Sequence, residues 1–320
     1  MSALDTLLSP AILFFVLGAL AAFARSDLAI PESVAKGLSL YLMAAIGLKG
    51  GVNVASAGFD PTMLAAIGVG VILSFSIPFV AAFLLRRVGG LDPLNAAAVA
   101  AHYGSVSVVT FAAATDVFTG SGIAPAGYMV AVLALMETPA ILSGLVLARR
   151  GGAQRDTAHR GELLREVLLN GSVVLLLGSF VIGLIAGKDG VAPIKPVFDT
   201  AFRGALCLFL LDMGLIAARR LMGSKLLNAR LVLLAILMPV VNGALGVVLG
   251  TAIGLDVGSA AGLGVLAASA SYIAVPAAMR LALPQADPGI YLSLSLGVTF
   301  PFNVTIGIAL MAWLAQRLAA

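Results

Sequence analysis

The chain has 320 residues, of which 61% are hydrophobic and 11% charged, and its mean hydropathy is +1.09. Water-soluble domains carry about 25% charged residues, so this composition predicts an integral membrane protein. The long apolar runs exclude an outer-membrane barrel, whose strands of about ten residues alternate in polarity. We attribute the net charge of +4 to membrane topology and expect no nucleic-acid partner.

Ten apolar segments approach the ~20 residues that are needed to cross the hydrocarbon core of a bilayer. The sequence therefore predicts an all-α membrane protein with five spans in residues 1–150, a polar cytoplasmic linker at 151–166 and five spans in 167–320. The predicted spans are 7–24, 32–52, 61–85, 93–115, 125–148, 168–186, 200–221, 229–253, 257–283 and 289–315.

The positive charges predict the orientation of these spans, because cytoplasmic loops are rich in Lys and Arg. With both termini outside, 14 of the 19 Lys and Arg residues fall on the cytoplasmic side. Arg86–Arg87 and Arg219–Arg220 then end spans at the cytoplasmic surface, where we interpret them as topological anchors. The five positive residues left outside are Lys49, Lys188, Lys195, Arg203 and Arg317.

Residues 91–107 and 255–271 align without a gap at a spacing of 164 residues. Because each half has an odd number of spans, the second copy must run opposite to the first, which makes the repeat inverted. Inverted repeats in a hydrophobic chain are typical of secondary transporters, whose binding site lies near the bilayer midplane between the repeats. The recurring residues are Leu91, Asp92, Ala96, Ala97, Ser105 and Ser107, repeated as Leu255, Asp256, Ala260, Ala261, Ser269 and Ser271.

Spans four and nine are each predicted to break into two half-helices, at 104–110 and at 268–276. Serine favours helix caps, and Pro276 cannot donate a helical hydrogen bond. Irregular backbone at this depth must line a cavity or the protein interior, and the N-terminus of a following half-helix favours an anion. The alternative is that Ser and Gly only mediate helix packing. The expected anion-binding residues are Gly104, Ser105, Ser107, Thr110, Ser269, Ser271 and Tyr272.

Two acidic residues, Glu137 and Asp212, lie near the middle of spans five and seven. A charge at that depth costs about 2.5–3.5 kcal/mol or more, so such groups mark ion paths or are protonated. Glu137 could coordinate a cation such as Na+ together with the carbonyl that Pro139 leaves unbonded, or it could carry a proton. The alternative for each residue is a neutral carboxyl hydrogen-bonded to a neighbouring helix. His102 is a candidate proton relay or interhelical donor, and Asn303 a candidate interhelical donor.

Several stretches, taken in chain order, carry a resemblance to the sodium-dependent bicarbonate transporter family of bacterial inner membranes. The resemblance implies a core domain that moves against a gate domain, a homotrimer and sodium-coupled bicarbonate uptake. It also implies a PII-like regulator on the cytoplasmic side. The stretches are Ala45–Gly51, Gly104–Ser107, Met136–Ala140, Phe202–Gly204, Pro239–Gly243 and Ala267–Ser271.

The chain departs from the well-studied members of that family at three places. Tyr272 follows the second serine motif where they carry Asp, Glu137 stands where they carry Asp, and the linker is shorter. The change at 272 bears on sodium coordination, because hard cations need charged oxygen ligands. The tyrosine hydroxyl could fill the cavity or bind a different anion, and Asp212 is a candidate for supplying the missing charge.

Two other functions fit the same residues. One is a cation/proton antiporter that uses Asp212 and Glu137 as exchange carboxylates, and the other is a non-transporting membrane sensor or scaffold that docks through its linker. The chain has no Gly-Lys-Ser phosphate loop and no Gly-x-Ser-x-Gly or His-Glu-x-x-His motif. We therefore expect neither an enzyme nor a bound cofactor.

Overall fold

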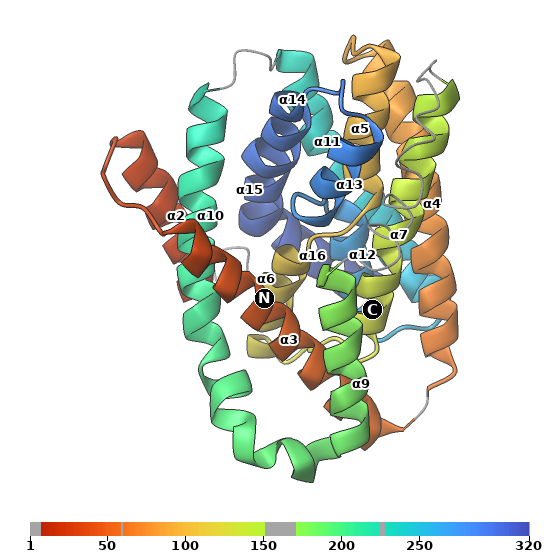
Figure 1. Cartoon of the computed structure of the whole chain (residues 1–320). Helices are drawn as coiled ribbons and strands as arrows, with labels where there is room; N and C mark the ends of the chain where they lie inside the picture. Colours follow the sequence, from red (N-terminus) through yellow and green to blue (C-terminus); the bar gives the residue numbers. More distant parts are fainter. Residues whose placement is uncertain (1–7, 59, 151–170, 224–227, 320) are drawn as a thin grey trace.

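The structure is a computed structural model that describes residues 8–58, 60–150, 171–223 and 228–319, so the predicted linker at 151–166 lies outside the described residues. Every regular element in these ranges is helical (Figure 1). The helices of the first half are α2 (Pro10–Phe23), α3 (Glu32–Ala57), α4 (Thr62–Arg87), α5 (Pro93–Gly104), α6 (Val108–Gly120) and α7 (Met129–Arg150).

The second half begins with α9 (Gly171–Val191), in which Gly187 has a non-helical φ of 62°. A 3-10 turn at Ala192–Ile194 and a π-helical turn at Pro196–Thr200 lead into α10 (Phe202–Gly223). The last segment contains two π-helical stretches, Ser293–Thr299 and Asn303–Gly307. The remaining helices are α11 (Ala229–Ala252), α12 (Val257–Ala268), α13 (Ala274–Ala282), α14 (Pro288–Leu292), α15 (Phe300–Phe302) and α16 (Ile308–Ala319).

The lengths of these helices suit a membrane protein. Among the described residues, eight helical stretches are long and apolar enough to cross a membrane, counting α5 with α6 as one stretch and α14 to α16 as another. The apolar helices α2 and α12 are shorter, with 14 and 12 residues. Helices are interrupted at both predicted breaks, after Gly104 and after Ala268.

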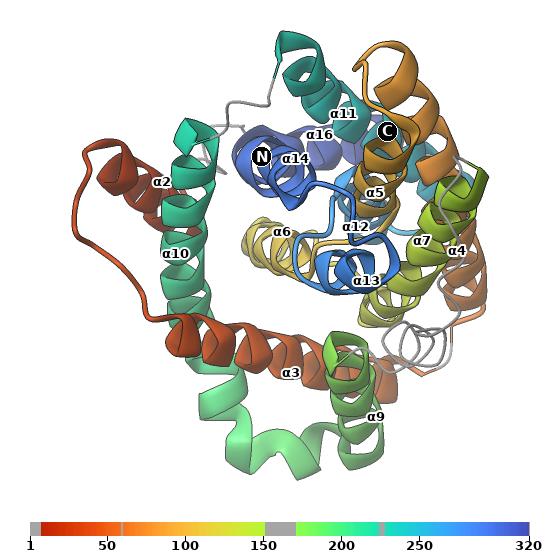
Figure 2. The ribbon, with the colours of Figure 1, turned by 45° about the horizontal axis from the view of Figure 1, so that its top comes forward.

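The helices form two groups that lie on different sides of the molecule (Figures 1 and 2). One group, which we call the frame, consists of α2, α3, α9, α10 and the turns that join α9 to α10. The other group, the bundle, contains α4 to α7 and α11 to α16. Within the frame, α2 packs on α10 and α3 packs on α9; within the bundle, α4 packs on α5 and α7, and α11 packs on α12 and α16.

Glycines bring the paired helices of the frame into backbone contact. A Cβ on Gly18 of α2 would lie 2.1 Å from the carbonyl oxygen of Leu211 in α10. A Cβ on Gly183 of α9 would lie 2.2 Å from the carbonyl oxygen of Leu48 in α3. The two glycines, Gly18 and Gly183, are 165 positions apart in the chain, and the two leucines, Leu48 and Leu211, are 163 positions apart. The same close helix crossing therefore occurs once in each pair, in keeping with the role of small residues in lipid.

Matching caps position the two helices that lead into the breaks. Asp92 and Asp256 have nearly identical backbone angles, with φ/ψ of −62°/161° and −60°/162°, and each accepts hydrogen bonds from the first turn of its helix. Such a cap stabilises a helix by about 1 kcal/mol. Gly90 and Gly254, two residues before each cap, have positive φ values of 74° and 83°. The α5 and α12 helices then both run for 12 residues.

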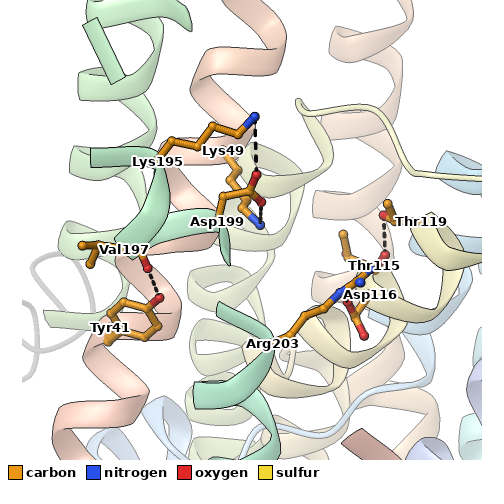
Figure 3. Close-up of polar contacts among 9 residues, drawn as sticks. All are labelled: Tyr41, Lys49, Thr115, Asp116, Thr119, Lys195, Val197, Asp199 and Arg203. Carbon is orange, nitrogen blue, oxygen red and sulfur yellow. Dashed lines mark hydrogen bonds and ion pairs between the residues drawn. The ribbon is translucent and has the colours of Figure 1, made fainter. Parts of the chain in front are cut away.

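Polar contacts also tie helices together near the predicted outer side (Figure 3). Lys49 of α3 forms an ion pair with Asp199 at 2.6 Å, and Lys195 lies 3.9 Å from the other carboxylate oxygen of Asp199. These contacts stay within the frame. The Arg203 guanidinium of α10 donates to Asp116 of α6 at 2.6 Å, so this ion pair links the frame to the bundle.

Gly183→Ala should destabilise the fold, because the added Cβ would meet the Leu48 carbonyl and force α3 and α9 apart. Overpacking of this kind typically costs about 1–3 kcal/mol. We expect a lower apparent melting temperature for the detergent-solubilised protein, measured by loss of the monodisperse peak in size-exclusion chromatography after heating.

Gly178→Ala on the same helix is the matched control, since a Cβ there meets nothing within 4 Å. Alanine is a better helix former than glycine by about 1 kcal/mol, so this variant should melt at or slightly above the wild-type temperature. Equal melting temperatures for the two variants would contradict the proposed close crossing.

Candidate functional site

The two predicted breaks lie side by side in the bundle. The N–H of Ser271 in the second break donates to the carbonyl oxygen of His102 near the end of α5, at 2.9 Å. Helices α5 and α12 each end at a serine in extended conformation, Ser105 with ψ of 175° and Ser269 with ψ of 160°. The breaks are thus joined to each other through the backbone, although more than 160 residues separate them in the chain.

A small cavity lies at this junction, with room for about one water molecule. It brings together four of the predicted site residues, Ser107, Glu137, Ser271 and Tyr272. Met43 of α3 also lines it, so one wall comes from the frame and the rest from the bundle. The remaining lining residues are Val106, Val108, Ile273 and Ala274.

Ser107 caps α6, and Ser271, two residues before the cap residue Ile273 of α13, accepts one longer bond from the first turn of that helix. Thr110 donates its N–H and its hydroxyl to Ser107 Oγ, at 3.1 and 2.9 Å. The N–H of Val275 donates to Ser271 Oγ at 3.4 Å. Because each Oγ accepts in these bonds, the hydroxyl hydrogen of each serine remains able to donate to a ligand.

The starts of α6 and α13 both border the cavity, through Val108 and Ala274. Among the described residues, the N–H groups of Val108 and Ala274 have no hydrogen-bond partner. The positive end of a helix dipole favours a nearby negative charge by about 0.3–2 kcal/mol. Two serine hydroxyls, two helix starts and unpaired amides therefore make this cavity suited to a small anion.

Glu137 lies in the same cavity as a buried carboxyl. Its side chain is only 3% exposed, and among the described residues Oε2 has no hydrogen-bond partner. Tyr272 lines the cavity from the second break, and its buried hydroxyl has no hydrogen-bond partner among the described residues. The ring packs against Phe300 at a centroid distance of 5.0 Å.

The other predicted anion-binding residues lie at the breaks but do not line the cavity. Gly104 ends α5 against Pro78 of α4, whose ring an added Cβ would overlap. Ser269 donates its hydroxyl to Val265 in its own helix at 2.7 Å. The Ser105 hydroxyl is buried and finds no partner within the described part of the chain. Thr110 contributes through its bonds to Ser107.

The structure places Asp212 apart from this group. It belongs to α10 in the frame and is only 4% exposed, with Oδ2 lacking a partner among the described residues. It is not one of the residues that line the cavity. The two intramembrane carboxyls predicted from the sequence therefore do not form one site.

Met43 is a neighbour of the site that was not predicted from the sequence, whereas His102 and Asn303 were. Met43 carries no motif, and only the crossing of α3 over the bundle brings it to the cavity. His102 donates its Nδ1–H to the carbonyl of Ala98 in its own helix at 2.7 Å and stacks on Tyr291, so it does not bond to another helix through that nitrogen. Asn303 does form the expected bond between helices, since its side-chain amide donates to the Ala268 carbonyl at 2.7 Å.

Comparison with known protein families gives one match. The model of the Na+-dependent bicarbonate transporter superfamily matches residues 10–316, which include both breaks and every residue of the cavity. Comparison with curated proteins found no match.

Ser107→Ala should lower the stability of the protein, because it removes the acceptor that caps α6. Loss of a serine cap costs about 1 kcal/mol. Ser105→Ala, two residues away, removes a buried hydroxyl without a partner and should be neutral or stabilising. Thermal unfolding in detergent compares the two variants with the wild type, and a larger loss for Ser105→Ala would contradict these assignments.

Proposed function

The chain belongs to the Na+-dependent bicarbonate transporter superfamily, and we propose that it is a secondary active transporter that takes up bicarbonate with Na+ by alternating access. The observation that carries this proposal is the cavity at which the two breaks meet. The family match supports the transport of bicarbonate across a membrane, and the helices are those of a multi-pass membrane protein.

We assign the bicarbonate to the cavity beside Ser107 and Ser271. The hydroxyl hydrogens and the free amides of the two half-helices are donors, which suits an acceptor-rich anion. A hydrogen bond to a charged group contributes about 1.5–3 kcal/mol. The cavity has room for about one water molecule in this conformation, so bicarbonate entry requires Met43 and the frame to move away from the bundle.

Glu137 gives a physical reason for coupling the anion to a cation. Two unit charges 4 Å apart interact by about 4 kcal/mol at an effective dielectric constant of 20. An ionised Glu137 would therefore repel bicarbonate unless a cation sits beside it or a proton neutralises it. We propose Na+ as the partner, in line with the family, and Glu137 as its charged ligand; the proton is the second candidate.

We further propose ten transmembrane helices in two inverted five-helix repeats. The frame crossings formed by Gly18 and Gly183, and the paired caps Asp92 and Asp256, support the repeat because they recur at spacings of 163 to 165 residues. A hydroxyl-to-carbonyl bond also joins the corresponding spans of each half, with the donor on opposite members of the pair. Ser74 of span three donates to the Met136 carbonyl of span five, and Thr299 of span ten donates to the Ala235 carbonyl of span eight. The bundle is then the moving core and the frame the gate.

The setting of the transporter is also part of the proposal. The charge distribution supports a bacterial inner-membrane protein with both termini outside. The family resemblance supports a homotrimer and a PII-like cytoplasmic regulator that would dock near residues 151–166.

Uptake of radiolabelled bicarbonate into proteoliposomes, with and without an inward Na+ gradient, tests the function. Wild-type uptake should be stimulated by Na+. Ser107→Ala and Ser271→Ala should each weaken apparent affinity about tenfold, as expected for loss of one hydrogen bond to a charged ligand, while keeping the stimulation by Na+. Glu137→Gln should remove that stimulation.

Two controls separate this proposal from its rivals. Ser56→Ala changes an exposed hydroxyl that bonds within α3 and should leave uptake unchanged. Asp212→Asn should also leave substrate affinity unchanged, whereas a cation/proton antiporter would lose its exchange activity. If wild-type proteoliposomes move no bicarbonate under any gradient, the transport proposal fails and a sensor or scaffold becomes the better interpretation.

Cross-linking Asp116→Cys to Arg203→Cys in a Cys207→Ser background should stop uptake almost completely. The reason is that these positions join α6 of the bundle to α10 of the frame, which must separate during transport. A reducible bifunctional thiol reagent makes the block testable, since uptake should return when the link is cleaved.

The matched control is Lys49→Cys with Asp199→Cys, an ion pair of similar length that lies wholly within the frame. Cross-linking there should leave uptake largely intact. Normal uptake by the Asp116→Cys/Arg203→Cys variant after cross-linking would mean that the frame and the bundle do not move against each other.

A further inference from the structure

A second cavity lies on the bundle, at the end of α4 that the charge distribution places on the cytoplasmic side. It has a volume of about 470 Å³, within the range of small-molecule sites in proteins. Its walls come from α4, the start of α5 and the end of α7. The lining residues are Phe79, Ala82, Phe83, Arg86, Arg87, Leu91, Pro93, Ala97 and Leu147.

The lining is divided into an apolar part and a cationic part along α4. Phe79 and Phe83 lie one helical turn apart, and Leu147 of α7 joins them. Arg86 and Arg87 follow in the last turn of α4. Since α4 is apolar enough to cross the membrane and ends at Arg87, the apolar part lies toward the hydrocarbon and the arginines toward the headgroups.

The arginines are free to bind an anion. Both side chains are exposed, and among the described residues neither forms an ion pair; Arg87 instead lies over the ring of Phe83 at 5.9 Å. The carboxylate of Asp92 nearby is already engaged in capping α5, where it accepts from the N–H groups of Leu94 and Asn95 and from the Asn95 side chain. Among the described residues it forms no ion pair with either arginine.

We propose that this cavity binds an anionic phospholipid, with its phosphate held by Arg86 and Arg87 and the start of an acyl chain packed on Phe79, Phe83 and Leu147. Guanidinium groups bind phosphate through paired, charge-assisted hydrogen bonds. The cavity also has an apolar wall on the membrane side of the arginines. An acyl chain can pack on this wall, whereas a free phosphate ion cannot. This site is separate from the bicarbonate cavity and does not rest on the transport proposal.

Native mass spectrometry of the purified full chain tests the site without requiring transport. Phosphatidylglycerol and phosphatidylcholine with the same acyl chains are titrated against delipidated protein. The first phosphatidylglycerol should bind about tenfold more tightly, because both lipids offer the same phosphate but only phosphatidylcholine brings a choline cation close to the two arginines. Arg86→Gln with Arg87→Gln should abolish this preference, and Phe83→Ala should weaken binding of both lipids.

Arg219→Gln with Arg220→Gln is the matched control, because it removes the same charge from the end of another helix. Arg219 donates to the Leu28 carbonyl at 2.8 Å, and this variant should keep the preference for phosphatidylglycerol. Three results would overturn the proposal: equal binding of both lipids by wild type, an equal loss in the control variant, or displacement of phosphatidylglycerol by millimolar inorganic phosphate.

Discussion

The need to satisfy backbone amides inside a membrane governs the structure around the two helix breaks. A polar group without a partner is costly away from water, so a helix can be interrupted in the bilayer only where protein surrounds it. Here Ser105–Ser107 and Ser269–Ser271 are buried, and Ser107 caps α6. Ser271 accepts from the Val275 amide, and its own amide bonds to the carbonyl of His102 near the other break. The few donors left over are those that a ligand could use.

Close glycine contacts occur in both the frame and the bundle, and hydroxyl-to-carbonyl bonds between helices add to them in the bundle. In the frame, glycines such as Gly18 and Gly183 let backbones touch, which suits helices that gain no hydrophobic energy from leaving lipid. In the bundle, hydroxyl groups such as that of Thr299 bond to carbonyls of neighbouring helices. The exposed ion pair between Arg203 and Asp116 spans the two groups, and such pairs contribute only about 0–1 kcal/mol. The two groups also touch through Phe15 on Phe300 and through α10 on the Ser293–Thr299 stretch, so a change in their relative position requires these contacts to rearrange.

The sequence predicted the helices and the breaks well, because both depend on local chemistry. Apolar runs located the helical stretches, and the repeated serines located the breaks to within a few residues. The sequence also selected Ser107, Glu137, Ser271 and Tyr272, which the structure brings into one cavity. It could not separate them from Gly104, which packs on Pro78, or from Asp212, which lies elsewhere, since those differences depend on how helices cross. Met43 was missed for the same reason.

The bond between the Ser271 amide and the His102 carbonyl bears on how the protein is made. The amino-terminal half leaves the ribosome first, and its break must wait for a partner that lies about 170 residues further along the chain. Until the ninth predicted span enters the bilayer, the carbonyl end of α5 lacks that partner. Assembly of the bundle is therefore a late event of biosynthesis, because the second half of the chain supplies the hydrogen-bond donor that the first half lacks.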